Sequence, residues 1–179
     1  AQAVDIQPKL ENISFEEAAS IPLGALTAWA SVIDTANVQA GQRVLVHGGA
    51  GGVGLYAVQL ALWKGARVTA TASAPNLDFI RSLGAENVID YNATRFENVV
   101  KDMDAVIDTV GGDLPERSFK LIRPGGVFVT VAARLPEDAG KAYSIRAVSA
   151  GRASSDHLKE IAELIEEGQL KPVVGTVFP

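Results

Sequence analysis

Hydrophobic positions along the chain gather in short β-branched runs that are separated by stretches of helical character. Within these runs nearly every position is apolar, rather than every second one. Strands with this pattern are typical of a parallel sheet in which helices cover both faces. We expect strands at 43–47, 66–72, 87–91, 104–110, 126–132 and 142–150.

Helix candidates alternate with these runs, which indicates βαβ units. Gly65 and Gly84 follow two of the candidates, where glycine can end a helix in the left-handed conformation. Ser14 and Glu17 fit a capping box that opens an N-terminal helical region of one or two helices. A long amphipathic helix closes the pattern, with Ser154 or Ser155 as its cap and Gly168 at its end. We expect the helices between strands at 53–63, 76–83, 94–101 and 114–121.

A glycine-rich loop, "GAGGVG" at 49–54, follows the first predicted strand and opens the first helix of the core. In this context G-x-G-x-x-G is the fingerprint of a dinucleotide site. Gly49 then permits a tight turn, Gly51 lets the backbone approach a pyrophosphate, and Gly54 lets the helix pack closely on the strand. The alternative is a tight strand-to-helix turn that binds no ligand.

The second predicted strand ends in "TATAS", without a carboxylate. Sites for NAD place an Asp or Glu there to accept hydrogen bonds from the ribose hydroxyls. Ser73 can instead donate to a 2′-phosphate, which an acid would repel. The sequence therefore favours NADP(H) over NAD(H). The alternative is that Ser73 only caps the turn before Pro75.

Few other side chains suggest chemistry. We expect Asp108 to brace the end of the fourth strand rather than act as an acid, and His47 to be structural. His157 is expected to face solvent on its helix, and Tyr56 and Trp63 to be helix packing. With two histidines and no cysteine in the chain, a structural metal is not expected.

Composition narrows the class of protein further. The 179 residues are 47% hydrophobic and carry a net charge of −5, which fits one globular domain and disfavours a nucleic-acid surface. Neither 18–33 nor 44–63, the stretches without charges, predicts a membrane span. The N-terminus has no signal pattern, and the absence of cysteine fits a reducing, cytoplasmic setting.

In motif order and spacing, the chain resembles the medium-chain dehydrogenase/reductase superfamily, and most of all its zinc-independent quinone oxidoreductase branch. The resemblance implies an α/β doubly wound, parallel six-stranded sheet (Rossmann fold) with strand order 3-2-1-4-5-6. It also implies a cofactor domain excised from a longer NADPH-dependent enzyme that transfers hydride to a quinone, enone or similar activated double bond. The motifs are "AASIPLGALTAWASV" (18–32), "GQRVLVHGGAGGVGLYAVQLA" (41–61), "LGAENVIDY" (83–91), "DAVIDTVGG" (104–112), "LIRPGGVFVTV" (121–131) and "LIEEGQLKPVVGTVFP" (164–179).

The same resemblance divides the single domain of 1–179 into linking helices (1–40), a Rossmann core (41–150) and a C-terminal helix with a return strand (151–179). It implies a homodimer that pairs edge strand 143–149 with its twin. No catalytic residue follows from it within this chain, and this fragment alone is expected to be inactive.

The resemblance also implies a cofactor site whose members share a place at the strand ends or beside them. Asn76 stands where the family often has a lysine for the 2′-phosphate, so it departs from the pattern. The implied contacts are Gly49, Ala50, Gly51, Gly52 and Val53 at the pyrophosphate; Ser73, Asn76 and Tyr91 at the 2′-phosphate and ribose; Val110 and Gly111 along the cleft; and Val131, Ala132, Ala133 and Thr27 at the nicotinamide.

Two other functions are compatible with a glycine loop. One is a dinucleotide-sensing or scaffold protein that keeps the fold without catalysis. The other is a methyltransferase, although such sites usually need an acid at the end of the second strand, which this chain lacks.

Overall fold

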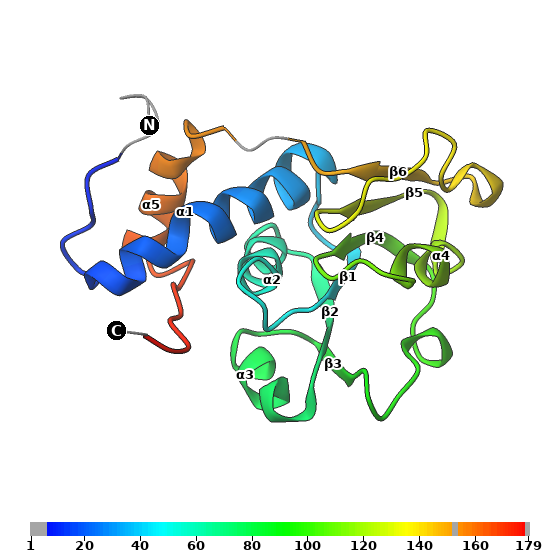
Figure 1. The fold of residues 1–179 in the computed structure, drawn as a ribbon, viewed down its shortest axis with the longest axis horizontal. Helices are drawn as coiled ribbons and strands as arrows, with labels where there is room; N and C mark the ends of the chain where they lie inside the picture. Colours follow the sequence, from blue (N-terminus) through cyan, green and yellow to red (C-terminus); the bar gives the residue numbers. More distant parts are fainter. Residues whose placement is uncertain (1–6, 152–153, 178–179) are drawn as a thin grey trace.

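A six-stranded sheet, all of whose paired strands are parallel, forms the centre of the computed structural model, which describes residues 7–151 and 154–177. The strand order is β3-β2-β1-β4-β5-β6, so the predicted α/β class and strand order are confirmed (Figure 1). The strands are β1 (Arg43–His47), β2 (Arg67–Ala72), β3 (Asn87–Asp90), β4 (Met103–Asp108), β5 (Ile122–Thr130) and β6 (Arg146–Ser149).

Helices cover both faces of the sheet, as the uniformly apolar strands required. In β1, Val44 and Val46 face one hydrophobic cluster, while Leu45 belongs to the other. The first cluster includes residues of α1 (Phe15–Trp29), α2 (Gly54–Trp63), α3 (Leu77–Ser82) and α5 (His157–Glu166). The second lies under α4 (Leu114–Phe119).

The N-terminal region forms α1 and a wider helical turn that continues it over Ala30–Thr35. Ser14 and Glu17 form the expected capping box, in which the Glu17 amide donates to Ser14 Oγ over 3.1 Å. The expected helix ends at Gly65, Gly84 and Gly168 all have positive φ. Local capping chemistry therefore set these boundaries.

The C-terminal helix α5 begins at His157, and neither Ser154 nor Ser155 supplies its N-cap. The prediction that His157 faces solvent is wrong. Its ring stacks on Trp29 with centroids 5.1 Å apart, and its nitrogens lie 2.6 Å from Glu160 and 3.5 Å from Asp34. The histidine thus joins α5 to α1, a contact between positions far apart in sequence.

The helix predicted over 94–101 is wrong: only Phe96–Asn98 makes a short 3₁₀ turn. Phe96 and Val100 are buried anchors, and Asp102 takes a positive φ of 53° directly before β4. The segment between β3 and β4 must cover the face of the sheet and then turn sharply into β4. This leaves no room for two helical turns.

Strand boundaries also differ at the far side of the sheet. β5 starts at Ile122 rather than at 126, because Ile122 pairs with Met103 ahead of a bulge in the pairing between Met103 and Ala105. β6 is shorter than 142–150, since Lys141–Tyr143 is a 3₁₀ turn. Residues 171–177 form no strand, which differs from the return strand expected in 151–179.

The strand order reverses between β1 and β4: the chain after β1 leads through α2 to β2 on one side, and the chain after β4 leads through α4 to β5 on the other. In open α/β sheets, ligands bind in the crevice at such a switch point. Within the described residues, no helix is long and apolar enough to cross a membrane.

Candidate functional site

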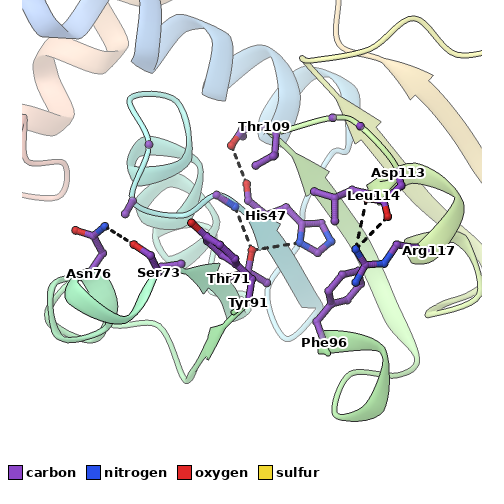
Figure 2. A pocket seen from close by; sticks show the side chains of 17 residues that line it. His47, Thr71, Ser73, Asn76, Tyr91, Phe96, Thr109, Asp113, Leu114 and Arg117 are labelled. Carbon is purple, nitrogen blue, oxygen red and sulfur yellow. Dashed lines mark hydrogen bonds and ion pairs between the residues drawn. The ribbon is translucent and has the colours of Figure 1, made fainter. Parts of the chain in front are cut away.

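A cleft of about 710 Å³ lies at the carboxyl ends of β1, β2, β3 and β4 (Figure 2). This volume falls within the usual range for small-molecule and cofactor sites. The lining combines backbone of the glycine loop, small polar side chains and a few large flat ones. It consists of His47, Gly48, Ala50, Gly51, Thr71, Ala72, Ser73, Asn76, Tyr91, Phe96, Thr109, Val110, Gly111, Gly112, Asp113, Leu114 and Arg117.

The glycine loop takes its shape from close backbone packing. The tight turn expected at Gly49 is instead made by Gly48, which has a positive φ of 73°. Gly49 is small for another reason: a Cβ there would lie 2.9 Å from Ala70 Cβ on β2. A Cβ on Gly54 would overlap the Gly48 carbonyl oxygen, so the predicted close approach of helix and strand at Gly54 is confirmed.

Several amides at the start of α2 have no partner within the described residues. The N–H groups of Ala50, Gly52, Val53 and Gly54 donate to no protein acceptor there, whereas the Gly51 amide donates to Gly48 O over 2.9 Å. A Cβ on Gly52 would meet nothing within 4 Å, so the loop is open on its outer side. Unpaired amides at a helix N-terminus favour an anion, because their dipoles point at it.

The floor of the cleft is a buried polar network around His47. One ring nitrogen lies 3.3 Å from Thr71 Oγ1 and the other 3.0 Å from Ser118 Oγ. Burial lowers the pKa of His47 to about 4, although the Asp108 charge opposes this shift. The Gly48 amide donates to Thr71 Oγ1 as well, so the neutral imidazole and the glycine loop share one partner. His47 is structural, as expected.

A second network forms the wall beside α4. The Arg117 guanidinium lies over the Phe96 ring, 4.7 Å from its centroid, and donates to Glu97 over 2.6 Å. That hydrogen bond is the main reason why the pKa of Glu97 falls to about 2. A weaker contact, at 3.3 Å, joins Arg117 to Asp113. Phe96 packs edge-on against His47, so this wall and the floor support each other.

Asp108 ties the loop after β4 to the loop after β5. One carboxylate oxygen accepts from the amides of Val110 and Gly111, each at 2.9 Å. The other accepts from Thr130 Oγ1 at 2.8 Å, and Thr130 in turn accepts from the Ala132 amide. Asp108 therefore braces the strand end, as predicted, and is fully buried.

The ends of β2 and β3 form a more open corner of the cleft. Asn76 Nδ2 donates to Ser73 Oγ over 3.0 Å. Asn76 is exposed, Ser73 is half-buried, and Tyr91 is 56% exposed. Asp113 is the acid in the cleft lining, and it pairs with Arg117 on the α4 side. Asp90, the last residue of β3, accepts from the Asn92 amide and does not line the cleft.

The structure brings most of the predicted site residues to the same edge of the sheet. A second hollow, of about 440 Å³, lies between α1 and the loop and includes Gly51, Gly52 and Val53. Val131, Ala132 and Ala133 follow β5 beside Gly111 without lining either hollow. Thr27 lies on α1 and lines neither hollow. The predicted residues that line the main cleft are Ala50, Gly51, Ser73, Asn76, Tyr91, Val110 and Gly111.

The sequence did not point to several residues that line the cleft, namely Gly48, Thr71, Ala72, Phe96, Thr109, Asp113, Leu114 and Arg117. Phe96 fell in a segment expected to be an ordinary helix, and Arg117 contacts that segment from α4, through the Phe96 ring and through Glu97, 20 positions away. The nearest available signal was that both segments follow the carboxyl ends of parallel strands, β3 for Phe96 and β4 for Arg117.

Comparison with known proteins gives a family match over residues 83–179, to a family described as zinc-binding dehydrogenase. Within residues 7–151 and 154–177, there is no group of three or more His, Cys, Asp or Glu that could hold a metal ion.

Individual relatives are similar over almost the whole chain. The NADPH-dependent alkenal/one oxidoreductase, chloroplastic, of Arabidopsis thaliana is 36% identical over 173 residues, which cover 96% of the chain and 42% of the relative. The solved quinone oxidoreductase from Coxiella burnetii is 36% identical, with a TM-score of 0.85 over 94% of the chain and 55% of its own. A solved NAD-dependent alcohol dehydrogenase is 34% identical, with a TM-score of 0.88; the match covers 98% of this chain and 55% of that protein. The chain thus spans about half the length of these relatives.

Proposed function

The chain belongs to the medium-chain dehydrogenase/reductase superfamily, in its zinc-independent quinone oxidoreductase-like branch, and from this premise we propose its function. It is the cofactor-binding part of an oxidoreductase that uses NADPH to transfer hydride to a quinone, enone or similar activated double bond. The activity belongs to the longer protein, because the chain spans about half of its relatives. Alone, it binds the cofactor without turnover.

The unpaired amides of Ala50, Gly52, Val53 and Gly54 carry this proposal. They lie at the N-terminus of α2 beside a cleft at the topological switch point, where their dipoles suit a pyrophosphate. The cradle has room for it, since a Cβ on Gly52 would meet nothing within 4 Å. Because every α-helix leaves its first N–H groups without an intrahelical partner, the feature that favours a ligand here is that these donors lie at the strand ends of the switch point.

The remaining site residues then take roles along one extended ligand. Gly49–Val53 surround the pyrophosphate; Ser73, Asn76 and Tyr91 contact the ribose and its phosphate; and Val110 and Gly111 line the path. Val131, Ala132, Ala133 and Thr27 serve the nicotinamide end. NADPH supplies the hydride when bound, and the residues of this chain orient it, so no protein nucleophile is required.

The corner at Ser73 supports NADPH rather than NADH. No carboxylate stands there to accept hydrogen bonds from ribose hydroxyls or to repel a 2′-phosphate. The relatives' names point both ways, since one is NADPH-dependent and another NAD-dependent.

The edge position of β6 supports a homodimer, because an unpaired edge can extend its sheet with a second copy. The lack of cysteine supports a cytoplasmic location, which is also part of the proposal.

The alternative is a non-catalytic dinucleotide sensor with the same fold. Both functions predict binding, so turnover of a quinone or enone by the full-length protein separates them. If the full-length protein binds NADPH but does not oxidise it with any such acceptor, the sensor function is favoured.

Fluorescence titration of the chain with NADPH tests the binding half. We expect saturable binding that is lost in Gly51→Val, because a branched side chain would enter the space that the pyrophosphate needs. Gly175→Val is the matched control, since Gly175 is exposed and a Cβ there meets nothing within 4 Å. Unchanged affinity in the Gly51 variant would refute the assignment of the loop.

A further inference from the structure

We infer that the corner formed by Ser73 and Asn76 recognises the 2′ substituent of the cofactor ribose with uncharged donors alone. In consequence, this chain accepts both NADPH and NADH, with a preference for NADPH of less than about tenfold. This inference rests on the proposed function and concerns how selective that site is.

The hydrogen bond between the two side chains sets what they can offer. Asn76 Nδ2 uses one hydrogen on Ser73 Oγ, which leaves its second hydrogen and the serine hydroxyl hydrogen as donors. The bond also holds the two groups 3.0 Å apart on the lip of the cleft. The pair therefore presents two neutral donors side by side, suited equally to a phosphate oxygen or a hydroxyl oxygen.

Three arginines, Arg81, Arg95 and Arg117, have acidic partners of their own. Arg81 pairs with Asp78 at 2.6 Å, and Arg95 lies 3.8 Å from Glu97; neither lines the cleft. Arg117 does line it, but its guanidinium is held by Glu97 and Asp113 on the other side of the cleft from Ser73 (Figure 2). Within the described residues, Arg117 is thus the one Lys or Arg that lines the cleft, and it lies away from the Ser73 corner.

The exposure of Ser73 and Asn76 to solvent limits how strongly these neutral donors can favour one dinucleotide over the other. Asn76 is exposed and Ser73 is half-buried, so each hydrogen bond to a phosphate replaces one that water already makes. A cation would add attraction for the phosphate, and an acid would repel it while binding the hydroxyls of NADH. Because both are missing, neither cofactor gains a large advantage.

Substitutions at Asn76 should move the selectivity in opposite directions. We expect Asn76→Lys to tighten NADPH binding about fivefold to tenfold at low salt, with NADH unchanged. We expect Asn76→Asp to weaken NADPH binding by a similar factor and leave NADH unchanged or slightly tighter. Asn98→Lys is the matched control, since it adds the same charge at an exposed position that does not line the cleft.

Calorimetric titration of both dinucleotides into each purified variant provides the test, with no turnover required. A dissociation-constant ratio below about tenfold in the native chain, widened by Asn76→Lys and inverted by Asn76→Asp, is the expected result. A native ratio above about 100-fold in either direction, with binding that still depends on Gly51, would overturn this inference alone. Absence of binding by either dinucleotide would overturn it together with the proposed function.

Discussion

The two halves of the cleft are built differently. At the ends of β1 and β4, nearly every polar group is buried and paired: Asp108 holds two loops, and His47 shares Thr71 with the glycine loop. At the ends of β2 and β3, Asn76 and Tyr91 are exposed and one side-chain hydrogen bond joins Ser73 to Asn76. The first half fixes backbone geometry, whereas the second can change side chains at little cost to folding.

Gly54→Val should break the first half most severely. Its Cβ would overlap the Gly48 carbonyl oxygen, which is backbone and cannot move aside without separating α2 from β1. We expect a loss of more than about 3 kcal/mol in the free energy of unfolding, measured by urea denaturation. Gly51→Ala, where the nearest atom is 3.3 Å away, should remain folded. Equal stability of the two variants would refute the packing role of Gly54.

Asp108→Ala should come next. The substitution leaves the Val110 and Gly111 amides and the Thr130 hydroxyl without their hydrogen-bond acceptor. We therefore expect a loss of about 3 kcal/mol in the free energy of unfolding. Asp113→Ala removes an exposed carboxylate from the same loop and should cost little. If the two variants were equally stable, Asp108 would not be the brace between the loops.

His47 should make stability depend on pH. Its pKa is lowered from 6.5 to about 4 in the folded chain, so between these values the unfolded state binds the extra proton. Stability from this group is therefore complete above pH 6.5 and falls as pH drops toward 4, by up to about 3 kcal/mol. His47→Gln should lose much less over that window. If the free energy of unfolding changed with pH in the same way in both proteins, His47 would not be a neutral, buried imidazole.

Ser73→Ala should have the smallest effect on stability. The hydroxyl is half-buried and accepts one hydrogen bond from an exposed amide, so we expect a change within about 0.5 kcal/mol by thermal or urea unfolding. A large destabilisation would mean that this corner is structural after all.

Features that depend on local sequence patterns could be predicted, whereas features that depend on contacts between distant segments could not. The apolar strands, the glycine loop and the capping box at Ser14 depend on local patterns, and the structure has them. The strand order was implied by the family resemblance, and the structure confirms it. The wall of Phe96 and Arg117 depends on a pairing between segments that local propensity does not connect. The helix expected over 94–101 failed for the same reason, because buried Phe96 and Val100 and the turn at Asp102 override helical preference. Likewise, the stacking of His157 on Trp29 joins α5 to α1 across most of the chain.

Amide chemical shifts test the central claim most directly, since the claim concerns N–H groups. With the ¹⁵N-labelled chain titrated with NADPH, the resonances of Ala50, Gly52, Val53 and Gly54 should shift more than those of the rest of the backbone, and Gly51→Val should abolish these shifts. Saturation of binding with those four resonances unmoved would contradict the account.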